Sequence, residues 1–267
     1  MNVCSNLRRL VRPVAATLAG LAVAAAVHAQ TVNEIVKKGK VTIGVVSGAP
    51  PFGTTDAQGN PAGYDVDVAH LVAKYMGVPA EIVPLTSPSR IPALESGKVD
   101  FLVATLAPTP ERAKAVMFSM PYSAFEMAIF APVAAKYGKL QDLGKKKVGV
   151  TRGTTQDTAL TRLAMPGTNI VRFEDDATTA QALISNQVDA VALPQTIGQE
   201  IVKSRAAGRF DSKFSFAQQP NSMTVRKDAF ELHQWLNNVI YFMKLNGELD
   251  GIARKWTNSP LPSLPVF

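Results

Sequence analysis

Runs of β-branched and apolar residues alternate with helical patterns along this 267-residue chain. The clearest helical pattern spans 64–76, where Val68, Leu71, Val72 and Tyr75 fall at i, i+3, i+4 and i+7 and form one apolar face. Strands that alternate with helices make mostly parallel sheets whose faces the helices cover. We therefore predict an α/β fold. The expected strands are 41–46, 81–85, 99–104, 148–151, 170–173 and 188–193.

The alternation falls into two series, separated by linking stretches at 125–133 and 218–226. Two series of this kind predict two lobes. In the first series, Thr109 is suited to be the N-cap, and Pro110 the first residue, of a further helix. The proline-rich tail at 259–265 is expected to be irregular. The other expected helices are 91–96, 154–164, 178–185, 229–245 and 249–256.

The first 29 residues predict export. Arg8, Arg9 and Arg12 precede a run of mostly Ala, Leu and Val at 14–27, and a small residue, Ala29, follows it. This order is typical of a secretory signal. A membrane anchor is the alternative, but a bilayer needs about 20 apolar residues and this run is shorter. We predict cleavage after Ala29, which places the mature protein in the periplasm.

The leader carries part of the basic charge and the single cysteine, Cys4. The net charge of +7 falls to +4 without the three leader arginines, and no cysteine then remains for a disulfide. A cysteine ahead of the apolar run is also wrongly placed for a lipoprotein. Lys145–Lys147 is the densest basic cluster and is interpreted as a solvated loop. Because no basic stripe is interleaved with aromatic residues, we expect no nucleic-acid partner.

The sequence lacks the motifs of common enzymes. It has no Gly-x-Ser-x-Gly elbow, no phosphate-binding loop with Gly-Lys-Ser/Thr and no dinucleotide fingerprint. Beyond the leader, the histidines are His70 and His233, too few and too distant for a metal cluster. Asp65 and Asp67 lie two apart on a helix and face different directions, so they are not a catalytic dyad. We expect no metal, cofactor or catalytic residue.

Six short motifs follow one another in a set order. They are Pro50-Pro51-Phe52, Gly63-Tyr64-Asp65-Val66-Asp67-Val68-Ala69, Arg90-Ile91-Pro92-Ala93-Leu94, Gly97-Lys98-Val99-Asp100, Thr109-Pro110-Glu111-Arg112 and Arg152-Gly153-Thr154-Thr155. In this order and spacing the set resembles family 3 of the bacterial extracellular solute-binding proteins, the polar amino-acid receptors of ABC importers. The resemblance covers essentially the whole chain beyond the leader.

The resemblance implies a type II periplasmic-binding-protein fold, with two α/β lobes that are joined by two crossing strands and close on a ligand. Carried onto this chain, the first lobe is 31–128 plus 223–267 and the second is 129–222. The implied function is capture of an amino acid or related small carboxylate for the membrane permease of an ABC importer, by a monomer that is not an enzyme. Periplasmic dehydratases of the cyclohexadienyl type resemble the same family, so that activity is the alternative.

The resemblance also implies how the solute is held. Arg112 matches the arginine that grips the ligand's α-carboxylate, and a guanidinium can meet a carboxylate with two hydrogen bonds. Backbone amides at Thr105 and Ala107 are expected to add donors. From the other lobe, Thr154 and Thr155 open a helix whose N-terminus suits an anionic group.

Further candidates complete the expected ligand-binding set. Ser87 and Arg90 resemble the pair that receives the side-chain carboxylate in glutamate/aspartate receptors, although Arg90 can equally form a structural salt bridge. Phe52, from the Pro-Pro-Phe motif, is included in the set. Asp176 lies close to where another ligand residue falls in the family, and can equally cap the next helix.

The chain departs from the family pattern at the ammonium side of the site. Pro194 stands where many receptors have an aspartate for the ligand's α-ammonium, Ala49 replaces the usual aromatic lid, and Val46 replaces a common acid. An ammonium group buried without a carboxylate is costly. Either Asp176 or Gln195 therefore meets the amine, or the ligand has no α-ammonium.

Overall fold

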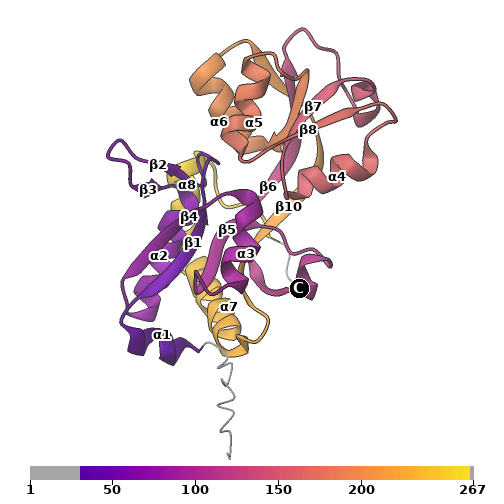
Figure 1. Cartoon of the computed structure of the whole chain (residues 1–267). Helices are drawn as coiled ribbons and strands as arrows, with labels where there is room; N and C mark the ends of the chain where they lie inside the picture. Colours follow the sequence, from indigo (N-terminus) through magenta and orange to yellow (C-terminus); the bar gives the residue numbers. More distant parts are fainter. Residues whose placement is uncertain (1–30, 265–267) are drawn as a thin grey trace, which may run out of the picture.

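The computed structural model describes residues 31–264. Figure 1 shows two bodies of strands and helices connected by two long strands, β6 (Val116–Pro132) and β10 (Phe210–Arg226). The two-lobed α/β arrangement expected from the sequence is therefore observed. The predicted leader, with Cys4 and the cleavage after Ala29, lies outside the described residues. Within those residues, no helix combines the length and the apolar character needed to cross a bilayer.

The first lobe is built on three parallel strands. β1 (Val41–Val46) pairs with β4 (Ala80–Leu85) on one side and with β5 (Phe101–Leu106) on the other. β1 and β5 are buried along their whole length, as expected for strands covered on both faces. The other elements of this lobe are α1 (Val32–Lys38), β2 (Thr54–Thr55), β3 (Pro61–Ala62), α2 (Tyr64–Met76), the 3₁₀ turns η1 (Ser87–Ser89) and η2 (Arg112–Lys114), α3 (Arg90–Glu95), α7 (Phe230–Leu245) and α8 (Glu248–Thr257).

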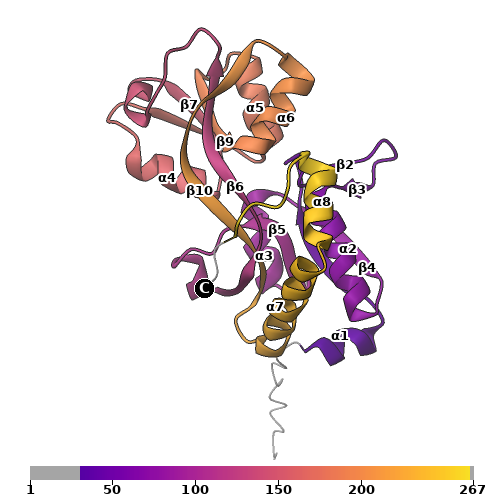
Figure 2. The same cartoon turned by 180° about the vertical axis from the view of Figure 1, so that it is seen from behind.

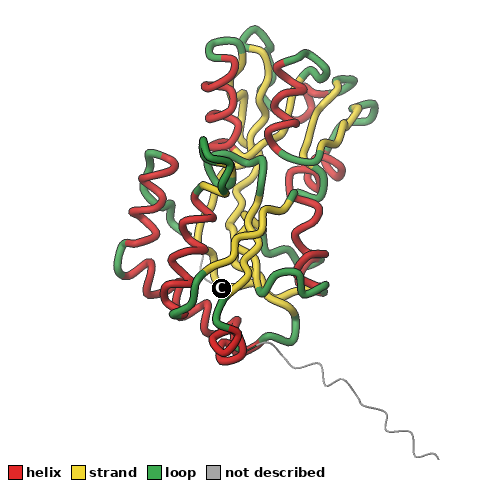
Figure 3. Tube along the Cα trace, turned by 60° about the vertical axis from the view of Figure 1, so that its left-hand side comes forward, coloured by secondary structure: helices red, strands yellow, loops and turns green. Residues whose placement is uncertain are grey.

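The second lobe follows the same plan. β7 (Lys147–Thr151) pairs in parallel with β8 (Asn169–Phe173) and with β9 (Ala190–Pro194). Figure 3 shows helices on both sides of the strands. The remaining elements of this lobe are η3 (Leu140–Leu143), α4 (Thr155–Leu163), α5 (Asp176–Ile184) and α6 (Gln195–Ala206).

One ladder of hydrogen bonds runs through both lobes, with its eight strands in the order β4-β1-β5-β10-β6-β9-β7-β8. β6 and β10 are antiparallel neighbours, paired from Val116 with Arg226 at one end to Pro132 with Phe210 at the other. The expected lobe limits, 128/129 and 222/223, both fall inside these crossing strands. The limits themselves stay predictions.

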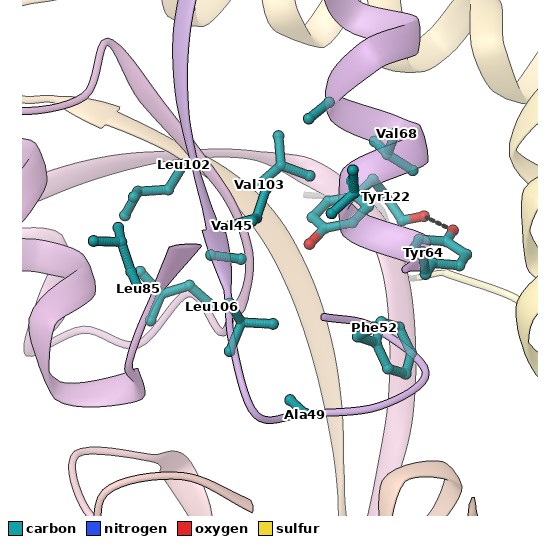
Figure 4. Close-up of a cluster of buried hydrophobic side chains, with 14 of the residues drawn as sticks. Val45, Ala49, Phe52, Tyr64, Val68, Leu85, Leu102, Val103, Leu106 and Tyr122 are labelled. Carbon is teal, nitrogen blue, oxygen red and sulfur yellow. Dashed lines mark hydrogen bonds between the residues drawn. The ribbon is translucent and has the colours of Figure 1, made fainter. Parts of the chain in front are cut away.

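Apolar side chains pack between α2 and the strands of the first lobe, as Figure 4 shows. Val45, Val68 and Val103 are at most 1% exposed. Removing such a side chain from water contributes about 1.5–3 kcal/mol to folding. The cluster includes Tyr64, whose hydroxyl donates a hydrogen bond to the backbone oxygen of Tyr122 at 3.0 Å, so its polar end is satisfied.

The chain after α8 runs back over the crossing strands (Figure 2). It has no helix or strand from 258 to 264, as the prolines predict. The amide of Leu261 donates to Asp250 Oδ1 at 2.9 Å and so fixes the segment to α8.

The prediction of a helix that begins at Thr109 is wrong. The cap does form, because Thr109 Oγ1 accepts a hydrogen bond from the amide of Arg112 at 3.3 Å. However, only the short turn η2 follows, since Val116 already pairs with Arg226 of β10. Tertiary pairing therefore overrides a strong local helix signal. Two helices, α1 and α6, were not predicted from the sequence.

Candidate ligand-binding site

A small cavity lies between the lobes, and both lobes contribute to its walls. Its volume is about 10 Å³, roughly the space that one water molecule occupies, so the surrounding side chains nearly touch. Of the expected ligand-binding residues, all except Phe52 and Ala107 line it. The lining residues are Ser87, Arg90, Thr105, Arg112, Phe125, Thr154, Thr155, Gln156, Asp176, Pro194 and Gln219.

Arg112 reaches from the first lobe to the second. Its Nη1 donates to the carbonyl oxygen of Ala107 at 3.0 Å, and its Nη2 donates to the carbonyl oxygen of Gly153 at 2.9 Å. Burial lowers the pKa of the Arg112 guanidinium to about 10, so the group stays charged at neutral pH. Carbonyl dipoles balance only part of this charge, and a carboxylate is the stronger acceptor for the same two nitrogens.

Arg90 is the second cation at the cavity and is only 3% exposed. Its Nε donates to the carbonyl oxygen of Ser87 at 2.9 Å, and its Nη1 donates to those of Ala104 at 2.8 Å and Thr105 at 3.2 Å. Burial, followed by the charge of Arg112, lowers the pKa of Arg90 to about 9. Within residues 31–264 its hydrogen bonds go to backbone oxygens, so the structural salt bridge weighed above is not observed. Its Nη2 has no hydrogen-bond partner in this range.

Asp176 supplies the single carboxylate among the lining residues. It is 5% exposed, and burial raises the pKa of its carboxyl group to about 6. The hydroxyl of Thr151 donates a hydrogen bond to Asp176 Oδ1, which acts in the opposite direction by favouring the charged form. The N-cap of α5 is Asp175 rather than Asp176. Asp176 is thus free of the capping role and faces the cavity.

The start of α4 forms the wall opposite Arg112. Thr154 is the N-cap, and its Oγ1 accepts a hydrogen bond from the amide of Asp157 at 3.2 Å. The amides of Thr155 and Gln156 have no hydrogen-bond acceptor within the described part of the chain. Unpaired amides at the beginning of a helix attract an anionic group.

Gln219, on β10, connects the two walls. Its side-chain Nε2 donates to the carbonyl oxygen of Thr105 at 3.2 Å and to Asn221 Oδ1 at 2.8 Å. Its Oε1 accepts a hydrogen bond from the hydroxyl of Thr155 in the second lobe. A residue of the crossing strands therefore bonds to both lobes at the cavity.

The lobes also touch beside the cavity. The amide of Ala177, in the first turn of α5, donates to the carbonyl oxygen of Gly48 at 2.8 Å. Gly153 packs against Pro88, whose Cα would lie 3.5 Å from a Cβ at that glycine. Together with the contact between Arg112 and Gly153, these contacts describe a closed arrangement of the lobes.

Residues 41–259 match the family model of the bacterial extracellular solute-binding proteins, family 3. The match covers most of the chain. The chain belongs to this family.

Curated relatives of this family 3 protein include the L-cystine-binding protein TcyJ of Escherichia coli strain K12. That protein is 26% identical over 90% of this chain and 91% of its own length. The glutamine-binding protein GlnH of an ABC transporter of Bacillus subtilis is 30% identical over 85% of this chain and 84% of its own length.

Solved structures agree with the family assignment. A solute receptor for L-cysteine of Neisseria gonorrhoeae is similar with a TM-score of 0.80 and 30% identity, covering 85% of this chain and 93% of that one. The ancestral amino acid-binding protein AncCDT-1, a precursor of cyclohexadienyl dehydratase, has a TM-score of 0.79 and 33% identity, covering 85% of this chain and all of its own. The predicted two-lobed type II fold is confirmed, and the family is one of binding proteins.

Several expectations for this family 3 site need correction or addition. The amide of Thr105 donates to the hydroxyl oxygen of Tyr122 at 3.0 Å, so it is not offered to a ligand in this arrangement. Phe52 is 2% exposed and lies behind the cavity, where its ring packs edge-on against that of Phe125 at 5.5 Å. Gln195 is engaged elsewhere, since its Oε1 accepts a hydrogen bond from the hydroxyl of Ser212 at 2.7 Å.

Phe125, Gln156 and Gln219 line the cavity but were not singled out from the sequence. Phe125 and Gln219 are direct partners in the β6–β10 ladder. Both linking stretches were recognised from the sequence; one contains Phe125 and the other contains Gln219. The available signal was a polar side chain, Gln219, in a stretch expected to pass between the lobes.

Proposed function

We propose that this family 3 protein captures an amino acid, or a related small carboxylate, in the periplasm and delivers it to the membrane permease of an ABC importer. The carrying observation is that the cavity at the lobe junction is lined by two guanidinium groups and one carboxylate, Arg90, Arg112 and Asp176. An amino acid carries an anionic and a cationic group close together, so its charges match these walls. The relatives named for cystine and glutamine support the same class of solute.

The α-carboxylate is assigned to Arg112 and to the first amides of α4. In the closed arrangement Nη2 of Arg112 donates a hydrogen bond to the carbonyl oxygen of Gly153 at 2.9 Å. A carboxylate there would replace a neutral acceptor by a charged one, which forms hydrogen bonds roughly twice as strong. Because the cavity is so small, binding of the solute must also break the hydrogen bond between Thr155 and Gln219.

The α-ammonium is assigned to Asp176. Pro194 lines the cavity but has no side-chain acceptor, and Gln195 is not among the lining residues. Asp176 is the lining residue whose charge can balance a buried ammonium group. The carboxylate and the ammonium group of the amino acid are thus assigned to different residues of the cavity.

The side chain of the solute is assigned to Ser87 and Arg90. Both line the cavity, and Nη2 of Arg90 keeps two N–H groups without a partner in residues 31–264. Donors of this kind favour a short side chain that ends in a carboxylate or carbonyl oxygen. We further propose that the protein is exported by its leader and acts as a monomer.

A binding screen tests the proposed function. The mature protein is heated with single L-amino acids and with small dicarboxylic acids, because a ligand that binds only the folded state raises the melting temperature. We expect a rise for short acidic or amide amino acids, followed by one-to-one binding in calorimetry. A flat response across amino acids and carboxylates would contradict the proposal.

The dehydratase alternative receives less support. The structural neighbour related to that activity is itself an ancestral amino acid-binding protein. Incubation with a prephenate-like acid, followed by product detection, separates the two functions, and we expect no turnover.

A further inference from the structure

A chain of buried polar groups lies directly behind the cavity. Asp65 and Tyr122 are both 0% exposed. The hydroxyl of Tyr122 donates to Asp65 Oδ1 at 2.8 Å and accepts from the amide of Thr105 at 3.0 Å. Figure 4 shows the ring of Tyr122 beside α2, near Tyr64 and Val68, in apolar surroundings. Neither Asp65 nor Tyr122 lines the cavity.

The hydroxyl has one proton, and Asp65 determines where it points. Because the hydroxyl of Tyr122 donates its hydrogen bond to Asp65, the hydroxyl oxygen accepts the hydrogen bond from the amide of Thr105. Burial raises the pKa of Asp65 well above its usual range, while its bond to Tyr122 and the charge of Arg90 act to lower it. Its other oxygen, Oδ2, has no hydrogen-bond partner within the described residues. Such a buried polar pair is costly, which calls for a reason beyond packing.

A single peptide group connects this pair to the cavity. The peptide group between Ala104 and Thr105 takes part in both contacts. Its N–H donates a hydrogen bond to the hydroxyl oxygen of Tyr122 at 3.0 Å, and its carbonyl oxygen accepts one from Nη1 of Arg90 at 2.8 Å. A peptide group is planar and rigid. Turning it away from Tyr122 would therefore also turn its oxygen away from Arg90.

The backbone at Thr105 requires support of this kind. Its φ is +45°, in the left-handed region that a β-branched residue rarely adopts. Such a conformation persists where surrounding contacts hold it. The carbonyl oxygen of Thr105 then accepts from Nη1 of Arg90 and from Nε2 of Gln219, both at 3.2 Å. The strained residue is thus the point where the buried pair meets two lining side chains.

We propose that Tyr122, held by Asp65, is a positioning residue for solute recognition. By fixing the backbone at Thr105, it sets the direction of the Arg90 guanidinium and the Gln219 amide. The inference rests on the proposed function of the cavity. It adds a requirement that residues outside the cavity must meet before the side-chain end of the solute is recognised.

The chain offers a matched pair of variants. Tyr122→Phe removes the hydroxyl that holds Thr105. Tyr64→Phe removes a similarly buried hydroxyl, whose one hydrogen bond within the described residues goes to the backbone oxygen of Tyr122. We expect Tyr122→Phe to weaken solute binding about tenfold, and Tyr64→Phe to change it less than about twofold. Equal affinities of Tyr122→Phe and the wild type in calorimetry would overturn the inference.

A double-mutant cycle with Gln219→Ala separates positioning from general loss of structure. If Tyr122 acts through Thr105 on Gln219, the loss from Tyr122→Phe shrinks in the Gln219→Ala background. Strictly additive losses would show that the two residues are uncoupled and would count against the inference.

A ligand-free readout distinguishes failure of this inference from failure of the proposed function. In Tyr122→Phe we expect faster hydrogen exchange at the Thr105 amide and a shifted Arg90 Nε–H resonance, with neither change in Tyr64→Phe. Unchanged signals in Tyr122→Phe overturn the positioning role whatever the protein binds. A wild type that shows these signals but binds no solute overturns the proposed function instead.

Discussion

The carbonyl oxygen of Gly48 in the first lobe and the amide of Ala177 in the second form a hydrogen bond of 2.8 Å. It joins two backbones, so the bond does not depend on a ligand. Gly48 has a φ of +66°, and a Cβ at this position would lie 2.6 Å from Cγ of Asp175. A glycine is needed here for its backbone conformation and for the close approach of the second lobe.

Gly48→Ala is expected to disfavour the closed arrangement. The added methyl meets Asp175 only when the lobes are together, so solute affinity should fall about tenfold, or about 1.4 kcal/mol, without a change in any lining side chain. Calorimetry and small-angle scattering with solute measure the effect. Gly59→Ala is the control, because that glycine also has a positive φ, +86°, but among the described residues other than its chain neighbours no atom lies within 4 Å of the added Cβ. A similar loss in both variants would assign the effect to backbone strain alone.

Arg112→Ala is expected to weaken solute binding by at least about 2 kcal/mol, because a buried charge pair loses one partner. Arg112→Lys should recover only part of this, since an ammonium group lacks the planar pair of donors. The matched control is Arg152→Ala, which removes a side chain that is 55% exposed and lies next to Gly153. Calorimetric affinity of Arg112→Ala equal to that of the wild type would refute the assignment of the carboxylate.

Amino-acid binding is expected to weaken as the pH falls through about 6. An ammonium ligand needs the ionised form of Asp176, whose pKa burial raises to about 6. Below that pH the affinity should drop by up to about tenfold per pH unit. Asp176→Asn should bind more weakly at neutral pH and lose this dependence. Calorimetry in two buffers that differ in ionisation enthalpy checks whether binding releases a proton.

The same carboxyl group affects folding with the opposite trend. Its pKa is higher in the folded protein than its ordinary 3.8, so the folded state holds the proton more tightly. Its contribution to the free energy of unfolding is therefore present at low pH and lost as the pH rises from about 4 through about 6. Urea unfolding of the wild type and of Asp176→Asn across this range measures the difference.

Alanine substitutions at two helical glycines are expected to change the free energy of unfolding in opposite directions. In Gly198→Ala the new Cβ would lie 2.3 Å from the ring of Phe130, so the variant should lose about 1–3 kcal/mol of unfolding free energy by overpacking. In Gly251→Ala the new Cβ meets no atom within 4 Å in residues 31–264, apart from its chain neighbours and the backbone of its own helix, and the variant should gain about 0.5–1 kcal/mol from helix propensity. Chemical denaturation compares the two, and a stabilised Gly198→Ala would show that α6 can move away from β6.

Periodic patterns were sufficient for most of the fold. The i, i+3, i+4, i+7 apolar face predicted α2 at 64–76 with the bounds that the structure has. The prediction failed at Thr109, where cap and proline chemistry favour a helix but pairing of β6 with β10 takes the residues from Val116 onward. Local sequence cannot reveal a strand partner that lies about a hundred positions away.

The candidate site was predictable to the extent that motifs mark it. Arg90, Arg112 and Asp176 were selected from the sequence and are brought together at the cavity. Gln219 was not selected. It is a polar side chain in a stretch expected to link the lobes, but the stretch alone does not indicate that β10 passes beside Thr105. The role of Tyr122 is also invisible in one dimension, since it depends on which peptide its hydroxyl meets.

The order of strands in the ladder has a consequence for how the chain can fold. β5 lies between β1 and β10, and β10 follows the entire second lobe in the sequence. During synthesis from the N-terminus, β7, β8 and β9 can pair as soon as they have been made. At that stage the edge of β5 still lacks its partner β10. The half that is synthesised first is thus completed last, and until then its open strand edge is exposed to other chains.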